Sequence, residues 1–284
     1  MYLANLLIKN GKNPGIVSRG YGRKSQGLVV VHDGEKMKAK VESTGDEPFL
    51  IASILKSVPV IVCEDRREAI RHLLNYSKIN IIIMDDGFQH RRVKRDLDII
   101  TISANDSKND YRLLPWGKLR EPFKNINRSN AIVFTKTDNY TPPNMLAEFQ
   151  SVFKGNSILS SIIPVLMRYD SSGYHKSLPS SEVLFAFCGI GEPDSFFKSI
   201  KQLDLKLGGN RIFSDHQGYT ESVITELSAQ IKSSNCTAII TTEKDLVKLP
   251  ESFLDEFEIF VIKIEVEFET EKAVLDMIQP VLLK

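Results

Sequence analysis

Short apolar runs along this chain alternate with longer stretches in which apolar residues recur every three or four positions. Unbroken runs of strand length predict β-strands, and the longer spacing predicts amphipathic helices. The predicted strands lie within residues 14–24, 58–65, 79–87, 97–103, 130–138, 183–191, 237–245 and 257–268. The predicted helices lie within residues 2–13, 45–57, 66–77, 193–203 and 220–234, and residues 27–42 are predicted to form a hairpin.

The order of these elements predicts the fold class. Strands without internal polar positions are typical of a mainly parallel sheet that helices cover on both faces. We therefore expect an α/β protein whose residues 1–153 form an open, mainly parallel sheet with flanking helices. Residues 154–181, which include Gly173 and Pro179, are predicted to be an extended linker, and residues 182–284 a smaller α/β domain.

Composition narrows the possible classes of protein. The chain has 284 residues, of which 42% are hydrophobic, so it can bury a sizeable core. A formal net charge of +1 provides no general attraction to nucleic acid, and none is expected as a partner. No apolar run approaches the roughly 18 residues that a transmembrane helix needs. Three widely spaced cysteines, Cys63, Cys188 and Cys236, predict buried thiols in a reducing compartment.

Polar clusters follow five of the predicted strands. The carboxyl ends of strands in an open α/β sheet border the usual ligand crevice, so these clusters predict one shared cleft. Turns favour the same residue types, however, so each cluster by itself has a purely structural interpretation. The five clusters are SRGYGR, MDDGFQH, FTKTD, FCGIGEP and TTEKD.

Each candidate residue has two interpretations at this stage. Asp85 and Asp86 could hold Mg²⁺ at a strand end or could be solvated turn residues. Arg91 and Arg92, with the bases around them and with Arg19 and Arg120, could bind an anionic substrate or could be solvated. Taken locally, Asp46 is better explained as a residue that stabilises a helix N-terminus, and His216 as a hydrogen-bonded structural histidine.

Taken together, the motifs closely resemble one family, the tetraacyldisaccharide 4′-kinases, which phosphorylate a lipid A precursor in Gram-negative bacteria. The similarity extends over nearly the whole chain, in the family's order, and DDGFQH together with LREP is its most specific part. The blocks are SRGYGRK (18–24), GDEP (45–48), DDGFQHRRVKRDLDI (85–99), LLPWGKLREP (113–122), FTKTD (134–138), FCGIGEPDSFF (187–197), FSDHQGY (213–219) and TTEKD (241–245).

The resemblance implies a fold, a reaction and a location. It implies a P-loop-kinase-like core and an enzyme that uses ATP and Mg²⁺ to phosphorylate the 4′-hydroxyl of an acylated glucosamine disaccharide 1-phosphate. It also implies that the enzyme acts at the cytoplasmic face of the inner membrane and contacts that membrane peripherally. The demands of phosphoryl transfer, namely charge neutralisation and an acceptor held in line, suit the residue types present.

The resemblance also assigns roles to individual residues. Asp46 matches the general base, His216 the histidine that pairs with it, and Arg120 a group that reaches the γ-phosphate. The remaining matches are Asp85 and Asp86 for the metal, Gln89, His90 and Glu121 around Mg²⁺ and the nucleotide, and Arg19, with Arg91 and Arg92 as further bases, for the anionic substrate.

One family motif has no counterpart in these residues. Members carry an amino-terminal hydrophobic helix and a Walker A loop of the GGTGKT type, but no Gly-x4-Gly-Lys-Ser/Thr occurs here; Gly22 and Gly27 have the glycine spacing, with Leu28 in place of the lysine. Because that loop cradles phosphates, we expect this chain as written to bind ATP poorly and to turn over slowly or not at all.

Two other functions remain open from the sequence. The chain could be a non-catalytic remnant that binds an anionic lipid or saccharide through Arg19, Arg91 and Arg92. It could also be an unrelated P-loop-like ATPase or GTPase in which TKTD imitates a guanine-binding element, although the missing Walker A loop disfavours this interpretation.

Overall fold

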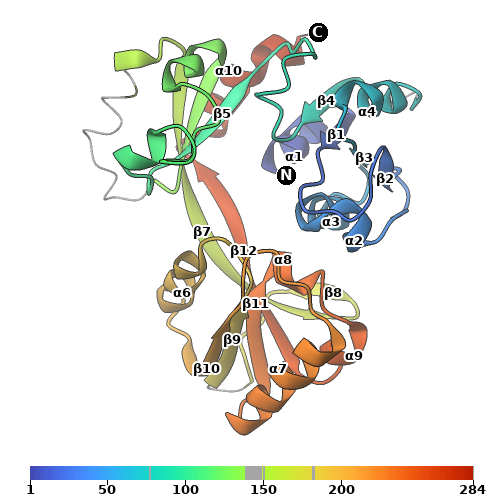
Figure 1. The fold of residues 1–284 in the computed structure, drawn as a ribbon, viewed down its shortest axis with the longest axis vertical. Coiled ribbons are helices and arrows are strands. Elements are labelled where there is room, and N and C mark those ends of the chain that lie inside the picture. The colour runs from blue at the N-terminus through green and yellow to red at the C-terminus, as the bar shows by residue number, and fades with distance from the viewer. Residues whose placement is uncertain (77, 138–148, 150, 181–182, 284) are drawn as a thin grey trace. The chain divides into compact units, whose positions relative to one another are not determined.

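The computed structural model describes residues 1–76, 78–137, 149, 151–180 and 183–283 (Figure 1). The chain forms two compact units, each assembled from separate segments. The first unit comprises residue 1 and residues 13–85 and 164–264, and the second unit comprises residues 2–12, 86–163 and 265–284. Each unit is described by itself below.

The first unit contains a four-stranded sheet in the order β2-β3-β1-β4. Strand β1 (Pro14–Ser18) pairs in parallel with β3 (Val60–Val62) and β4 (Ile81–Met84), and β2 (Val29–His32) is antiparallel to β3. The connecting helices are α2 (Val41–Thr44), α3 (Asp46–Ile54) and α4 (Arg66–Leu73). Buried apolar residues of α4 and of the strands form one core, which includes Val17, Ile61, Ala69 and Leu73.

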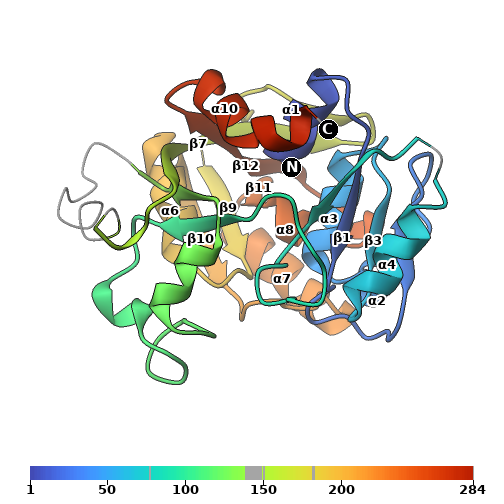
Figure 2. The ribbon, with the colours of Figure 1, turned by 90° about the horizontal axis from the view of Figure 1, so that it is seen from above.

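The first unit also contains the parallel strands β10-β9-β11-β12, three of which Figure 1 shows side by side. These are β9 (Val183–Cys188), β10 (Lys206–Ile212), β11 (Ala238–Thr242) and β12 (Glu258–Phe268). Alternate residues of β9 pack against α6 (Pro193–Gln202) on one face and α7 (Glu221–Ser233) on the other, and the two helices lie apart in Figure 2. Two short helices, α8 (Glu243–Leu246) and α9 (Glu251–Leu254), follow β11.

The second unit contains the parallel strands β5 (Ile99–Ser103) and β6 (Ala131–Thr135) and the beginning of β7 (Asn156–Asp170). Helices α1 (Tyr2–Lys9) and α10 (Glu271–Leu282) and the 3-10 helices η1 (Lys108–Tyr111) and η2 (Phe123–Arg128) also belong to it. Its aromatic core includes Phe134, Phe149 and Phe153. Strands β7 and β12 each have residues in both units. In the first unit, β7 pairs with β8 (Gly173–His175).

The predicted fold class is confirmed: the protein is α/β, with mainly parallel strands and flanking helices. The three cysteines are buried and unpaired, as predicted. Among the described residues, no helix is both long enough and apolar enough to span a lipid bilayer.

The predicted organisation along the chain differs from the structure in three respects. Residues 154–181 were expected to be a linker, but most of them form β7 and β8. The boundaries 1–153 and 182–284 do not match the two units, which draw residues from both ranges. The expected hairpin at residues 27–42 has one strand, β2, and beyond its turn only an isolated bridge between His32 and Met37.

Candidate functional site

Asp46 is the first residue of α3, and the backbone before it has an unusual conformation. Gly45 has φ 87° and ψ 155°, a region that residues with side chains avoid. A Cβ atom at Gly45 would lie 2.7 Å from the carbonyl oxygen of Tyr21. The glycine thus lets the chain turn sharply into the helix, and the Asp46 side chain is left only 13% exposed.

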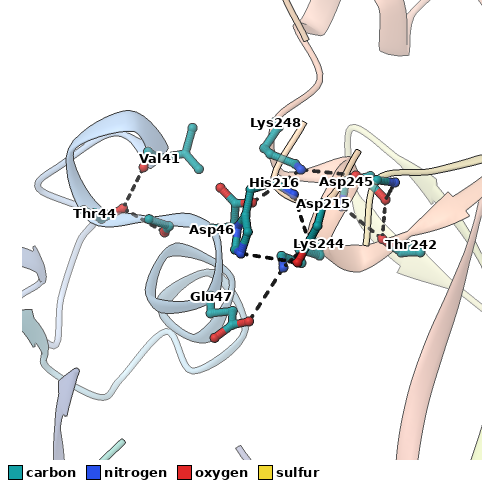
Figure 3. Close-up of polar contacts among 12 residues, drawn as sticks. Val41, Thr44, Asp46, Glu47, Asp215, His216, Thr242, Lys244, Asp245 and Lys248 are labelled. Atoms are coloured by element: carbon teal, nitrogen blue, oxygen red, sulfur yellow. Dashed lines mark hydrogen bonds and ion pairs between the residues drawn. The ribbon is translucent and has the colours of Figure 1, made fainter. Parts of the chain in front are cut away.

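His216 lies in the loop between β10 and α7 and contacts Asp46 (Figure 3). Its Nδ1 is 3.2 Å from Asp46 Oδ2, and its ring centroid is 5.8 Å from that of Tyr21. The His216 backbone has φ 58°, and its N–H donates to the carboxylate of Asp215 over 2.9 Å. With Nδ1 as the donor, the imidazole fixes the orientation of the carboxylate and supports its negative charge.

Two lysines add positive charge beside this pair. Lys248 Nζ lies 3.4 Å from Asp46 Oδ2, and its side chain is 6% exposed. Lys244 Nζ lies 3.2 Å from Asp215 and 3.7 Å from Glu47. Burial by itself would raise the pKa of Asp215, but the contacts with Lys244 and His216 together lower that pKa below its ordinary value. Asp215 is therefore a carboxylate near neutral pH.

A buried carboxylate, Asp245, lies behind these lysines in α8. Its Oδ2 accepts from the Gly189 N–H over 3.0 Å and from the Thr242 hydroxyl over 2.7 Å. Its Oδ1 accepts from the Tyr219 hydroxyl over 2.9 Å. Burial, and then the Asp245 charge, raise the pKa of Tyr219, so the phenol remains a proton donor. Asp245 is thereby fixed in one orientation.

The loop after β1 contains two arginines in different surroundings. Arg19, the predicted base for the anionic substrate, is exposed. Arg23 has a side chain only 3% exposed and pairs with Glu64 over 2.5 Å. Its guanidinium also donates to the carbonyl of Gly27 over 2.6 Å. Arg23, the second arginine of the SRGYGRK motif, is thus engaged in holding this loop together.

The second unit contains the other predicted residues. Arg120 donates to the Asp86 carboxylate over 3.0 Å. Glu121 accepts from Arg128 over 2.6 Å and from Gln89 over 3.4 Å. The side chains of Arg91 and Arg92 are exposed, and the backbone carbonyl of His90 accepts from Arg95 over 2.8 Å.

Asp85 follows β4 in the first unit. Its Oδ2 accepts from the Ser18 hydroxyl over 2.9 Å, and its backbone N–H donates to the Val17 carbonyl over 2.8 Å. Within the described ranges, no three His, Cys, Asp or Glu side chains gather closely enough to hold a metal. Carboxylate oxygens are nevertheless the ligands that Mg²⁺ prefers, so the donor type fits the predicted role of Asp85 and Asp86.

The structure brings together some predicted site residues and adds others. It places Asp46 in contact with His216 and Arg120 in contact with Asp86. Sequence reasoning did not single out Lys248, Asp245 or Tyr219, although Asp245 and Tyr219 lie in quoted motifs. Lys248 follows the acid of TTEKD by three residues, the spacing of an i,i+3 ion pair, which is a signal that could have identified it. Asp138 of the TKTD motif lies outside the described residues.

Comparisons with known proteins agree with these motifs. The profile of the tetraacyldisaccharide-1-P 4′-kinase family (LpxK) matches residues 1–282. The tetraacyldisaccharide 4′-kinase of Desulfotalea psychrophila is 35% identical over 270 residues, which are 91% of this chain and 75% of the relative. That of Aquifex aeolicus is 34% identical over 277 residues, which are 96% of this chain and 81% of the relative.

A solved structure gives the same result. The crystal structure of LpxK from Aquifex aeolicus in complex with ATP has a TM-score of 0.73 to this chain at 31% sequence identity. The similarity covers 99% of this chain and 82% of that structure.

Proposed function

Because the chain belongs to the tetraacyldisaccharide 4′-kinase family, we propose that it transfers the γ-phosphoryl group of ATP to the 4′-hydroxyl of a tetraacylated glucosamine disaccharide 1-phosphate. The observation that carries this proposal is the contact between His216 and Asp46. A carboxylate oriented by an imidazole and largely shielded from water is suited to accept a proton from an alcohol.

In this reaction Asp46 is the general base. The Asp46 carboxylate takes the proton of the 4′-hydroxyl as the hydroxyl oxygen forms its bond to the γ-phosphorus. The bond between that phosphorus and the β,γ-bridging oxygen breaks, and its electron pair leaves with ADP. His216 donates to Asp46 Oδ2, so the other carboxylate oxygen is left to face the acceptor.

The remaining predicted residues bind ATP and its metal. Asp85 and Asp86 are proposed to hold Mg²⁺, which neutralises phosphate charge when bound. Gln89, His90 and Glu121 are proposed to surround the nucleotide and the metal. The exposed guanidinium of Arg120 is proposed to release Asp86 and bind the γ-phosphate, where its charge stabilises the transition state.

Exposed side chains support the proposed lipid substrate. Arg19, Arg91 and Arg92 are exposed and positively charged, as groups that bind the 1-phosphate must be. We also propose peripheral contact with the cytoplasmic face of the inner membrane. Leu114 and Trp116 are 59% and 78% exposed, and apolar and indole side chains of this kind partition into membrane interfaces.

Transfer of radiolabelled phosphate from ATP to the disaccharide 1-phosphate tests the function. Replacing Asp46 by Asn keeps the shape but removes the base, and should lower kcat by roughly 10²-fold or more. Asp255→Asn, at an exposed aspartate after α9, is the matched control and should have wild-type kcat. If Asp46→Asn is as active as the control, Asp46 is not the base.

A second candidate function is binding of an anionic lipid or saccharide without catalysis, to which the exposed cations Arg19, Arg91 and Arg92 are suited. The two candidates predict different outcomes in one pair of assays. A kinase forms labelled product, and a non-catalytic binder retains the disaccharide 1-phosphate in equilibrium binding without labelling it. In the second case, Arg19→Gln should weaken binding and Asp46→Asn should leave it unchanged.

A further inference from the structure

Lys248 is a buried cation that contacts two carboxylates. Its Nζ lies 3.4 Å from Asp46 Oδ2 and 3.2 Å from Asp245 Oδ1 (Figure 3). The side chain is only 6% exposed, and its ammonium lies 5.4 Å from the centroid of the Tyr219 ring. A lysine is seldom buried to this extent unless its charge is compensated.

The contact with Asp245 fixes where this charge lies. Asp245 is fully buried and accepts hydrogen bonds from Gly189, Thr242 and Tyr219. Lys248 is three residues beyond Asp245 in the sequence, and its ammonium forms an ion pair with the Asp245 carboxylate. Because hydrogen bonds hold that carboxylate, it cannot rotate. The Lys248 ammonium is therefore presented to Asp46 from a fixed point.

Lys248 and His216 contact the same oxygen of Asp46. The distances to Oδ2 are 3.2 Å from His216 Nδ1 and 3.4 Å from Lys248 Nζ. Among the residues that the structure describes, the one hydrogen bond to the Asp46 side chain is that of His216 to Oδ2, so Oδ1 accepts none. A hydrogen bond from His216 and an ion pair with Lys248 at one oxygen restrict the orientation of the carboxylate and leave the other oxygen available to an acceptor hydroxyl.

We propose that Lys248 is a positioning residue for this site: its buried ammonium, paired with Asp245, places a positive charge beside the Asp46 carboxylate and directs Oδ1 of Asp46 toward the acceptor hydroxyl. The proposal rests on the kinase function proposed above. It assigns no contact with substrate to Lys248, which acts through Asp46. His216 supplies a hydrogen bond to this largely buried carboxylate, and Lys248 adds an ion pair to the same oxygen.

The other charged and titratable groups around Asp46 do not replace Lys248. The loop after β10 contributes His216, Asp215 and Tyr219; α8 contributes Lys244 and Asp245; α3 contributes Glu47; and the loop after β1 contributes Tyr21, whose ring contacts His216. Lys244 pairs with Asp215 and Glu47, so its charge is directed elsewhere. Without Lys248, the fully buried carboxylate of Asp245 would lack its cation.

The test compares Lys248→Met, which removes the charge at similar length, with Lys248→Arg, which keeps it. For Lys248→Met, the acidic limb of the kcat/KM profile should move up by roughly one pH unit or more. On the acidic limb kcat should fall while the KM for ATP stays the same, and activity should recover as the pH is raised. Lys248→Arg should restore much of the wild-type profile. Lys272→Met, at an exposed lysine of α10, is the control.

A titration without turnover separates this proposal from the proposed function. The protein is labelled with ¹³C at its aspartate carboxyl carbons, and the Asp46 resonance is identified as the one that disappears in Asp46→Asn. This resonance should titrate at higher pH in Lys248→Met than in wild type. If the wild-type chain shows no phosphoryl transfer, the kinase function fails, and this titration still decides the role of Lys248. Either of two results would overturn the proposal. One is an unshifted resonance, and the other is a uniform loss of activity together with lower thermal stability and an unshifted acidic limb.

Discussion

His216 Nδ1 lies 3.2 Å from Asp46 Oδ2, although the two residues are 170 positions apart in the sequence. Asp46 starts α3, and His216 lies in the loop before α7, so neither helix by itself positions the pair. Both loops have positive φ values, at Gly45 and at His216. The contact therefore depends on two unusual backbone turns as well as on two side chains.

The first prediction separates the His216 side chain from its backbone. Asn tolerates the positive φ of 58° and can donate from its amide near the position of Nδ1, whereas Ala offers no donor and strains the turn. Steady-state kinetics should give a larger loss of kcat for His216→Ala than for His216→Asn. Thermal unfolding of both variants checks that they fold. Equal loss in both would mean that the imidazole acts by some means other than donation to Asp46.

The second prediction concerns Gly45. An alanine there would have to adopt φ 87° and would place its Cβ 2.7 Å from the Tyr21 carbonyl oxygen. We expect Gly45→Ala to lower the free energy of unfolding by about 1–3 kcal/mol and to lower kcat, because the first turn of α3 must move. Gly218→Ala is the control for stability, since a Cβ there meets nothing within 4 Å. Urea denaturation of both variants measures the difference.

The residues found and missed by sequence reasoning differ in the kind of physical signal they carry. Buried strands such as β9 and β11 are unbroken apolar runs, so their existence follows from local pattern. Strand β10 (KLGGNRI) was missed because two glycines and three polar residues obscure its alternating burial. Residues 154–181 suggested a linker because Pro164, Gly173 and Pro179 punctuate them, and pairing with distant strands makes β7 a strand.

The residues of the candidate site also divide into those that the sequence could identify and those that it could not. Asp46 and His216 could be nominated from motifs, but their contact depends on how separate segments pack. Arg23 and Arg19 occur in one motif and have the same chemistry, and sequence could not tell which is buried. Lys248 carries no local signal of burial either, since an isolated lysine is usually exposed.

The third prediction compares the effects of replacing Arg23 and Arg19 on stability and on substrate binding. Arg23→Met removes the hydrogen bonds that this largely buried side chain makes to Gly27 and Glu64 and should lower the free energy of unfolding by about 1–3 kcal/mol. Arg19→Met should leave stability within about 0.5 kcal/mol of wild type but raise the KM for the disaccharide 1-phosphate, because Arg19 is exposed. Chemical denaturation and substrate titration together test both statements. The assignment is reversed if Arg19→Met destabilises the protein more than Arg23→Met does.

The fourth prediction concerns stability and pH. His32 is 4% exposed, and its Nδ1 accepts from the Gly34 N–H over 3.0 Å. Burial lowers the pKa of His32, and the nearby Asp33 only partly opposes this effect. Below about pH 6.5 the unfolded chain therefore binds a proton at this residue more readily than the folded protein does. Stability should fall as the pH drops from about 6.5 through the lower pKa of the folded state.

Replacing His32 separates its contribution to the pH dependence of stability from the contributions of other titrating groups. His32→Gln cannot titrate, so its free energy of unfolding should fall less than that of wild type between pH 7.5 and pH 5.5. The slope due to one such group is at most about 1.4 kcal/mol per pH unit. Urea denaturation at both pH values measures it. Parallel losses in wild type and variant would show that His32 does not contribute.

The fifth prediction concerns the proposed membrane contact. Leu113, Leu114 and Trp116 are 45%, 59% and 78% exposed on one turn of the second unit. Backbone hydrogen bonds order this turn, from the Leu114 N–H to the Leu119 carbonyl over 2.9 Å and from the Leu119 N–H to the Arg112 carbonyl over 3.0 Å. An ordered apolar tip flanked by exposed cations such as Arg112 suits an anionic lipid surface.

Trp116 is the one tryptophan in the sequence, so its fluorescence reports on this turn alone. Vesicles that contain phosphatidylglycerol should shift its emission to shorter wavelength, and purely zwitterionic vesicles should shift it less, because the exposed Arg112 attracts anionic lipid. Leu114→Ser should weaken the shift by removing apolar area, whereas Leu178→Ser, at an exposed leucine of the first unit, should leave it unchanged. Cosedimentation without an emission change would place membrane contact on another surface. Absence of both would refute the membrane contact itself, since a water-exposed indole cannot enter a lipid interface without a change in its surroundings.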